Sequence, residues 1–169
     1  FSLWNDSIAH YNSPAIEIAV AIFILLFGVN FNLYYFLALK KFSLVFKNEE
    51  LRTYLGIIAA ATIVIGVSIL GNYDSAGEAF RKSFFMVSST ITSTGFATAD
   101  TGEWGNFPQT LMLLLMFVGA CAGSTGGGMK VFRFIILWRA AKNELRRLIH
   151  PKSISVIKAN NEVFEDNVI

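Results

Sequence analysis

The sequence predicts an all-α membrane protein in which a short helix enters the bilayer and returns as a loop between longer helices. One observation is composition, since 54% of the 169 residues are hydrophobic and 16 are phenylalanine, a balance too apolar for an ordinary soluble domain. Another is that the apolar residues form uninterrupted runs long enough to cross about 30 Å of hydrocarbon. The third is a half-length helical pattern, followed by a hydroxyl-rich loop, between two of these runs.

Two apolar runs near the N-terminus are predicted to be membrane-spanning helices. The first, residues 16–39, follows Pro14 and precedes a pair of lysines. As one helix it would cover about 36 Å, which is enough for one tilted crossing. The second, residues 55–70, carries no charge and makes a full crossing only if Thr53 and Tyr54 are counted at the interface.

A third apolar region, residues 107–138, is predicted to be a helix that is broken in its middle. Its first half ends at Val118 and its second half resumes at Met129. The residues between them, 119–128, include five glycines, each of which costs a helix about 1 kcal/mol relative to alanine. We therefore expect an unwound segment at membrane depth, facing protein or a water-filled cavity.

Between the second and third apolar regions, residues 76–88 have the pattern of a short helix. Ser75 and Glu78 have the spacing of a capping box, and an apolar run follows. The helix would be about 20 Å long, too short to cross the bilayer. A helix that enters and cannot leave must return as a loop, and the hydroxyl-rich residues 88–96 are predicted to form that return.

The basic residues fall in two regions that we expect to be cytoplasmic, because cytoplasmic loops carry an excess of Lys and Arg. Residues 71–106 contain two basic residues, Arg81 and Lys82, and four acidic residues. This segment is expected to lie outside. Glu17, at the outer end of the first span, is interpreted as a boundary charge. The basic residues are Lys40, Lys41, Lys47 and Arg52 in the first region, and Lys130, Arg133, Arg139, Lys142, Arg146, Arg147, Lys152 and Lys158 in the second.

The return loop Thr92-Ser93-Thr94-Gly95-Phe96 has the chemistry of a cation filter. Potassium-channel filters replace the hydration shell of the ion with rings of backbone carbonyls, which requires unusual backbone angles. Gly95 can adopt positive φ, Ser93 and Thr94 offer hydroxyls as well as carbonyls, and Phe96 is bulky enough to pack behind the loop. The preceding helix would direct its partly negative C-terminus at the ion. The alternative is a polar turn in an outer loop.

Two motifs together resemble the Trk/Ktr/HKT superfamily of cation transporters. One is the loop at residues 92–96, and the other is the stretch GACAGSTGGGMKVFR at residues 119–133. Residues 13–17 and 30–33 also resemble the second helix of one of the family's repeats. The resemblance implies four repeats of helix, re-entrant pore helix with filter loop, and helix in one polypeptide, with pseudo-fourfold symmetry around one pore as in K⁺ channels.

By resemblance, the chain is expected to be an internal fragment that covers the end of the second repeat and the third repeat. Residues 1–39 would be the outer segment and second helix of the preceding repeat, and residues 40–52 a cytoplasmic loop. Residues 53–150 would form one complete repeat, and residues 151–169 a cytoplasmic connection to the next repeat. One of four filter loops would then be present.

The resemblance also implies site residues. The carbonyls of Ser93 and Thr94 would bind K⁺, next to the glycine, Gly95, on which the family's K⁺ preference depends, with Thr92 and Phe96 flanking them. The gating loop beneath the filter would consist of Gly119, Gly123, Ser124, Thr125, Gly126, Gly127 and Gly128.

Two pairs of residues, one in the glycine-rich stretch and one just after it, keep alternatives open. Gly119 and Gly123 have the small-xxx-small spacing of a helix-packing face. Lys130 and Arg133 could pair with loop carbonyls, lie on the ion path, or snorkel to the interface.

The function implied is potassium uptake across the bacterial inner membrane by a multi-pass, channel-like transporter subunit that is not an enzyme. K⁺ would be the transported ion, with no covalent cofactor. The expected partners are the lipid bilayer, the other repeats of the polypeptide, a second copy in a homodimer and a cytosolic nucleotide-binding regulatory subunit, with no nucleic acid. The choice between K⁺ and Na⁺, and between a channel and a proton- or sodium-coupled mechanism, depends on regions beyond this sequence.

Two other function classes compete with transport. An intramembrane serine hydrolase could use Ser124, but it needs a base, and the histidines, His10 and His150, lie outside the predicted spans. A non-conducting scaffold or sensor would have no reason for a half-length helix that ends on a hydroxyl-rich loop. The single cysteine, Cys121, excludes an intrachain disulfide.

Overall fold

The computed structural model describes residues 2, 4, 6–149, 157–159 and 162–164. Within these residues the regular structure before residue 150 is helical, and a short antiparallel hairpin follows it. In chain order the elements are η1 (Ser7–Tyr11), α1 (Pro14–Phe27), α2 (Phe31–Ala38), α3 (Phe42–Lys47), α4 (Glu49–Ser68), η2 (Leu70–Asn72), α5 (Ala76–Ile91), η3 (Thr101–Trp104), α6 (Asn106–Val118), α7 (Val131–Ile149), β1 (Ile157–Ala159) and β2 (Glu162–Phe164).

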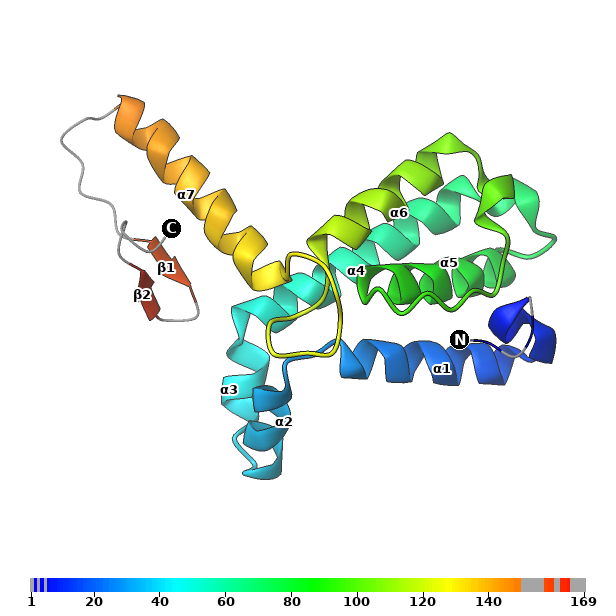
Figure 1. Cartoon of the computed structure of the whole chain (residues 1–169), viewed down its shortest axis with the longest axis horizontal. Helices are drawn as coiled ribbons and strands as arrows, with labels where there is room; N and C mark the ends of the chain where they lie inside the picture. The colour runs from blue at the N-terminus through cyan, green and yellow to red at the C-terminus, as the bar shows by residue number, and fades with distance from the viewer. Residues whose placement is uncertain (1, 3, 5, 150–156, 160–161, 165–169) are drawn as a thin grey trace.

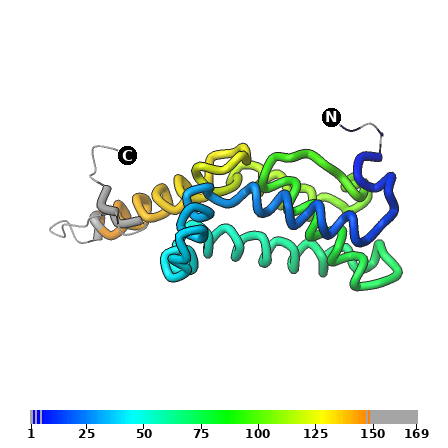
Figure 2. The backbone as a smooth tube through the Cα atoms, turned by 90° about the horizontal axis from the view of Figure 1, so that it is seen from below, coloured from blue at the N-terminus to red at the C-terminus, as the bar shows by residue number. Residues whose placement is uncertain are grey.

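The half-length helix α5 lies at the centre of a four-helix body and packs against α1, α4 and α6 (Figure 1). Its side chains Phe85, Val87 and Ile91 have no exposed surface. Figure 2 shows α1 and α4 crossing this body in opposite chain directions, whereas α7 extends beyond it. A short helix enclosed on three sides can hold a polar loop at its end inside the protein, away from lipid.

The second predicted span is confirmed as α4, which begins earlier than residue 55. The helix has 20 residues, about 30 Å, and in the described part of the chain it is the single unbroken helix long and apolar enough to cross a membrane. Its N-cap is Asn48, whose side chain accepts a hydrogen bond from Leu51 N at 2.9 Å. The acidic pair Glu49 and Glu50 forms the first turn, where the helix dipole favours negative charge.

The run predicted as one continuous helix, residues 16–39, is broken in the structure. α1 ends at Phe27 and α2 begins at Phe31, and the two helices meet at 93°. α1 alone is about 21 Å long, shorter than the hydrocarbon core. The break is stabilised by Asn30, whose side chain caps α2 by accepting a hydrogen bond from Asn32 N at 2.9 Å.

The predicted half-length helix is confirmed as α5, which continues three residues past the expected end at residue 88. Its predicted capping box is wrong, because the Ser75 side chain makes no cap hydrogen bond. Glu78 instead lies 3.6 Å from the Arg81 guanidinium. α6 and α7 confirm the broken third region, with residues 119–130 as the break.

Beyond α7, the chain forms a two-stranded hairpin in which Ile157 pairs with Phe164. This hairpin falls in the segment predicted as a cytoplasmic connection. It stands apart from the four-helix body of α1, α4, α5 and α6 (Figure 1). Because the hairpin follows the last helix, the expectation that the membrane region is all-helical is unchanged.

Two glycines of α4 give a test of how closely α5 must approach this helix. A Cβ added at Gly66 would lie 2.6 Å from the Phe80 ring of α5, whereas one at Gly56 would meet nothing within 4 Å. We expect Gly66→Ala to destabilise the protein by about 1–3 kcal/mol through overpacking. The matched Gly56→Ala should be neutral or stabilising by up to about 1 kcal/mol. Thermal unfolding of the full-length protein in detergent would measure both, and equal effects would contradict the packing described here.

Candidate ion filter and glycine loop

The predicted filter loop leaves the C-terminus of α5 with an alternating backbone. Ser93 has φ +56° and Gly95 has φ +82°, whereas Thr94 between them is not in the positive-φ region. The left-handed conformation costs a residue with a side chain roughly 1–2 kcal/mol, so Ser93 is held in place by its surroundings. The positive φ predicted for Gly95 is confirmed, and the loop cannot continue as either helix or strand.

Three consecutive carbonyl oxygens of this loop, those of Ser93, Thr94 and Gly95, accept no hydrogen bond from the described residues. The carbonyls on either side are occupied. Thr92 O accepts a hydrogen bond from Gly127 N at 3.2 Å, and Phe96 O accepts one from the Ser89 hydroxyl at 2.6 Å. The free acceptors are therefore confined to the central residues of the loop, where a cation could use them as ligands.

The last turn of α5 fixes the shape of the loop. Thr94 N donates to Ser89 O at 2.9 Å, and the Thr92 hydroxyl donates to Ser88 O at 2.8 Å. The hydroxyls of Thr92 and Thr94 lie 2.8 Å apart and share a hydrogen bond. Phe96 is partly buried against the core, as expected for a residue behind the filter. The Thr94 N–H and the hydroxyls of Thr92 and Thr94 are therefore engaged in hydrogen bonds, and the central carbonyls are left as available ligands.

A buried ion cluster braces the chain after the filter. The Lys82 ammonium lies 2.6 Å from Glu17 Oε1 and donates to Thr98 O at 2.9 Å. Arg81 Nε donates to Glu17 Oε2 at 2.8 Å. Glu17 is 3% exposed, so its interpretation as a boundary charge is wrong. The three residues join α1, α5 and the return segment, and only the tertiary fold brings Glu17 to partners more than 60 positions away.

The glycine-rich break forms an Ω-loop, residues 119–130, whose ends touch each other. Gly119 and Gly128 have φ of +76° and +80°, and a Cβ at Gly128 would lie 2.6 Å from Gly119 Cα. Val131 N donates to Ala120 O at 3.0 Å, which closes the neck of the loop. Gly123 also has positive φ, so Gly119 and Gly123 do not form a helix-packing face, and that alternative is wrong.

The Ω-loop docks onto the break between α1 and α2. Cys121 N donates to Gly28 O at 3.1 Å, and Phe31 N donates to Gly123 O at 3.1 Å. The Thr125 hydroxyl donates to Phe27 O at 3.2 Å. Helix ends leave backbone groups without intrahelical partners. At this junction the unpaired groups of one broken helix are satisfied by the other.

The same loop lies directly against the filter, beside the C-terminal end of α5 (Figure 1). A Cβ at Gly127 would lie 2.9 Å from the Ser93 hydroxyl oxygen, and one at Gly126 would lie 2.5 Å from the Ala120 Cβ and 3.3 Å from Thr92 O. Gly126 and Gly127 are therefore both required to be glycine, because the first packs closely against Ala120 and Thr92 and the second against Ser93. This is the physical reason for a glycine run that helix packing could not explain.

Of the two basic residues considered for the pore, Lys130 belongs to the loop and Arg133 does not. Lys130 has φ +75°, and its ammonium donates to Gly126 O, which selects pairing with a loop carbonyl among the alternatives. Arg133 is exposed on α7 and makes no hydrogen bond or ion pair with the described residues.

Nothing in the described part of the chain activates Ser124 as a nucleophile. Its hydroxyl donates to Cys121 O at 2.6 Å. His10 lies in η1, where its ring stacks on Trp4 with centroids 3.9 Å apart, and His150 lies outside the described residues. The serine hydrolase alternative therefore has no base next to its nucleophile.

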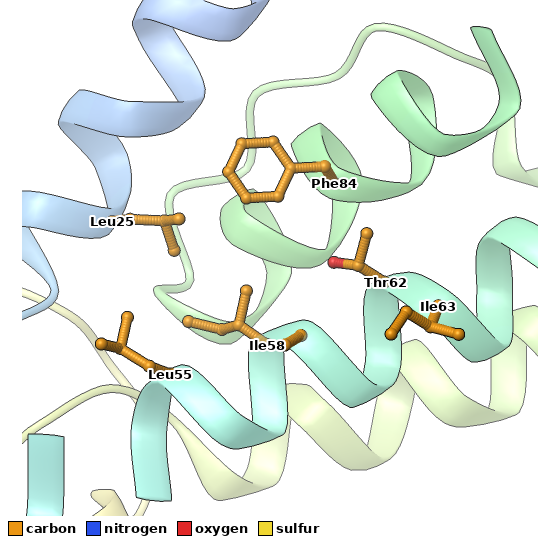
Figure 3. Close-up of a pocket in the computed structure, with 7 residues that line it drawn as sticks. Leu25, Leu55, Ile58, Thr62, Ile63 and Phe84 are labelled. Carbon is orange, nitrogen blue, oxygen red and sulfur yellow. The ribbon is translucent and has the colours of Figure 1, made fainter. Parts of the chain in front are cut away.

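The structure also contains an apolar groove between α1, α4 and α5. Figure 3 shows Leu25 of α1 and Phe84 of α5 facing a groove that runs along α4. Its volume is about 370 Å³. Ile58 and Thr62 form part of its floor, and a surface with so few polar atoms offers no ligands to an ion.

Comparison with known proteins identifies the family. Residues 51–168 match the model of the TrkH family, described as a cation transport protein. The chain belongs to this family. It is 33% identical over 174 residues to the Trk system potassium uptake protein TrkH of Salmonella typhimurium, covering 100% of this chain and 36% of that protein. It is 34% identical over 172 residues to TrkG of Escherichia coli, covering 100% and 35%.

A solved structure agrees with the TrkH family fold. The crystal structure of the potassium transporter TrkH from Vibrio parahaemolyticus superimposes with a TM-score of 0.90 at 33% identity, over 99% of this chain and 37% of that chain. The predicted fold class, an all-helical membrane protein of this superfamily, is thus confirmed. The chain spans about a third of the length of these relatives.

The ion cluster behind the filter gives a second stability test. Lys82→Met would leave the Thr98 carbonyl unpaired and Glu17 with one cation fewer. We expect a loss of about 1.5–3 kcal/mol, because a buried hydrogen bond to a charged group is removed. Glu78→Gln is the control, since its ion pair with Arg81 is more exposed and should contribute less than about 1 kcal/mol. Equal melting temperatures for the two variants in detergent would contradict the brace.

Proposed function

We propose that this chain supplies one filter loop and one gate of a channel-like subunit that takes up K⁺ across the bacterial inner membrane. The observation that carries the proposal is that the carbonyls of Ser93, Thr94 and Gly95 accept no hydrogen bond from the described residues, at the end of a helix too short to cross. The C-terminus of α5 adds partial negative charge at this point. A cation that has lost its water would find both ligands and a favourable potential there.

Potassium is the ion that the proposal favours. The relatives that match the whole chain are potassium uptake proteins by name. In this chain Gly95 has the positive φ that lets carbonyls on either side face one axis. The K⁺ ligands in the proposal are the carbonyls of Ser93 and Thr94, with Thr92 and Phe96 as supports whose own carbonyls are occupied.

The Ω-loop at residues 119–130 is the proposed gate. Its Gly127 N–H binds the carbonyl of Thr92 at the inner end of the filter, so an ion leaving the filter on that side would meet the loop. Backbone groups at this depth tolerate exposure only to protein or a water-filled cavity. A loop that swings aside when α7 is pulled would expose such a cavity.

The proposal also includes the membrane topology of the chain and its partners. The basic regions 40–52 and 130–158 would be cytoplasmic, with the acidic outer segment facing the other side. Residues 1–39, 40–52, 53–150 and 151–169 would be the end of one repeat, a cytoplasmic loop, one repeat and a connection. The other repeats, the lipid bilayer, a second copy and a cytosolic nucleotide-binding subunit would be partners, and no role for a covalent cofactor or nucleic acid is proposed.

Gly95→Ser in the full-length protein tests the filter. The substitution places a side chain at φ +82°, so we expect the carbonyls to turn and ⁸⁶Rb⁺ uptake to lose rate and selectivity over Na⁺. Gly105→Ser is a matched control, because Gly105 also has φ +82° but lies outside the filter with nothing within 4 Å of its Cβ position. It should lower stability without changing ion preference. An unaltered rate and selectivity in Gly95→Ser would reject the filter assignment.

Removing the Ω-loop tests the gate. Because the backbones of Gly119 and Gly128 already touch, deletion of residues 120–127 with direct joining of these two glycines should leave α6 and α7 in place. We expect faster ⁸⁶Rb⁺ flux in proteoliposomes, since the obstruction below the filter is gone. Flux equal to that of the wild type, with the protein folded by size-exclusion chromatography, would contradict the gating role.

A further inference from the structure

The carboxylate of Glu50 is enclosed at the point where the Ω-loop meets the start of α4. Glu50 is 2% exposed and is the second residue of the helix. Its Oε1 accepts a hydrogen bond from Ala122 N at 2.5 Å. The Asn30 side chain and the Phe132 backbone N–H also hydrogen-bond to this carboxylate. All three donors are amides.

These three donors belong to three different segments of the chain. Ala122 lies in the Ω-loop, and Asn30 lies in the break between α1 and α2, where it also caps α2. Phe132 lies in the first turn of α7, whose N–H groups have no intrahelical partners and whose dipole favours an anion. One carboxylate therefore ties the loop, the α1–α2 break and the start of α7 to α4.

No lysine or arginine in the described part of the chain forms a salt bridge with Glu50. Burying a carboxylate without a paired cation is costly unless hydrogen bonds replace its water. The amide donors do this here, helped by the nearby charge of Lys130 in the Ω-loop. The Ala122 N–H can leave the carboxylate only if the loop moves. Movement of the loop therefore breaks a hydrogen bond to a charged group, which is among the stronger kinds in proteins.

We propose that Glu50 is a positioning residue that latches the Ω-loop beneath the filter, and that the loop opens only when Ala122 leaves the carboxylate. The proposal rests on the gating role proposed above. It adds the contact that holds the gate shut, and it places that contact on the rigid spanning helix α4.

Cys121 provides a reporter that does not depend on ion flux. It precedes Ala122, has no exposed surface, and is held by the hydrogen bond from its N–H to Gly28 O at 3.1 Å. A thiol in this position reacts with a maleimide only when the loop departs. Its rate of modification therefore measures how often the latch opens.

The experiment compares wild type, Glu50→Ala and Glu50→Gln in the full-length protein, reconstituted in proteoliposomes. Modification by N-ethylmaleimide is followed at the Cys121 peptide by mass spectrometry, and ⁸⁶Rb⁺ uptake is measured in parallel. We expect Glu50→Ala to raise the modification rate about tenfold or more, as loss of a hydrogen bond to a charged group implies. Glu50→Gln keeps an acceptor oxygen and should give a smaller rise. Uptake should rise in the same order.

The control is Glu49→Gln, one position earlier in the same turn. Glu49 is more exposed and pairs with Arg139 of α7, so its variant should keep nearly the wild-type labelling rate. An equal rise in Glu49→Gln and Glu50→Ala, or no rise in Glu50→Ala, would overturn the latch. If the alanine variant does not fold, Glu50→Gln decides alone, and a wild-type rate in it overturns the proposal. Faster labelling with unchanged uptake would keep the latch and reject the gating role of the loop.

Discussion

The need to satisfy backbone hydrogen bonds at membrane depth is the constraint on which the rest of this structure depends. Two helices are broken, at residues 28–30 and 119–130, and each break exposes N–H and carbonyl groups that lipid cannot satisfy. The structure solves this by placing the breaks against each other. Gly28 O, Gly123 O and Phe27 O all accept hydrogen bonds across this junction. Each break supplies hydrogen-bond partners to the other, so irregular backbone is confined to one place.

The filter loop uses the same junction. Thr92 O accepts a hydrogen bond from Gly127 N, and the next three carbonyls accept none from the part of the chain that the structure describes. The glycines at 126 and 127 let two backbones approach to a distance that any side chain would prevent. The proposed ion ligands and the proposed obstruction beneath them are thus built from backbone. A movement of the Ω-loop alters the base of the filter directly, without a chain of intermediate side chains.

Charged side chains fix this arrangement from two sides. Glu17 holds Arg81 and Lys82 behind the filter, while Glu50 accepts amide hydrogen bonds beneath it. Both carboxylates are buried, and each connects elements distant in the sequence. The first pairs with cations on α5, which makes a rigid brace. The second is held by amide hydrogen bonds and by the nearby charge of Lys130, without a salt bridge among the described residues, which makes a contact that can be released.

The sequence by itself determined the composition of the site and most of the elements around it. Hydrophobic runs located α4 and α6, and the apolar run after Ser75 and Glu78 located α5. The glycines at 95 and 119–128 marked the backbone positions that depart from helix, because local conformation follows from local residues. The tertiary structure alone decided the 93° break after Phe27, since Asn30 is a small polar interruption in an apolar run. It also decided the roles of Glu17 and Glu50, because the partners of a buried charge are set by packing between distant segments, which no local pattern records.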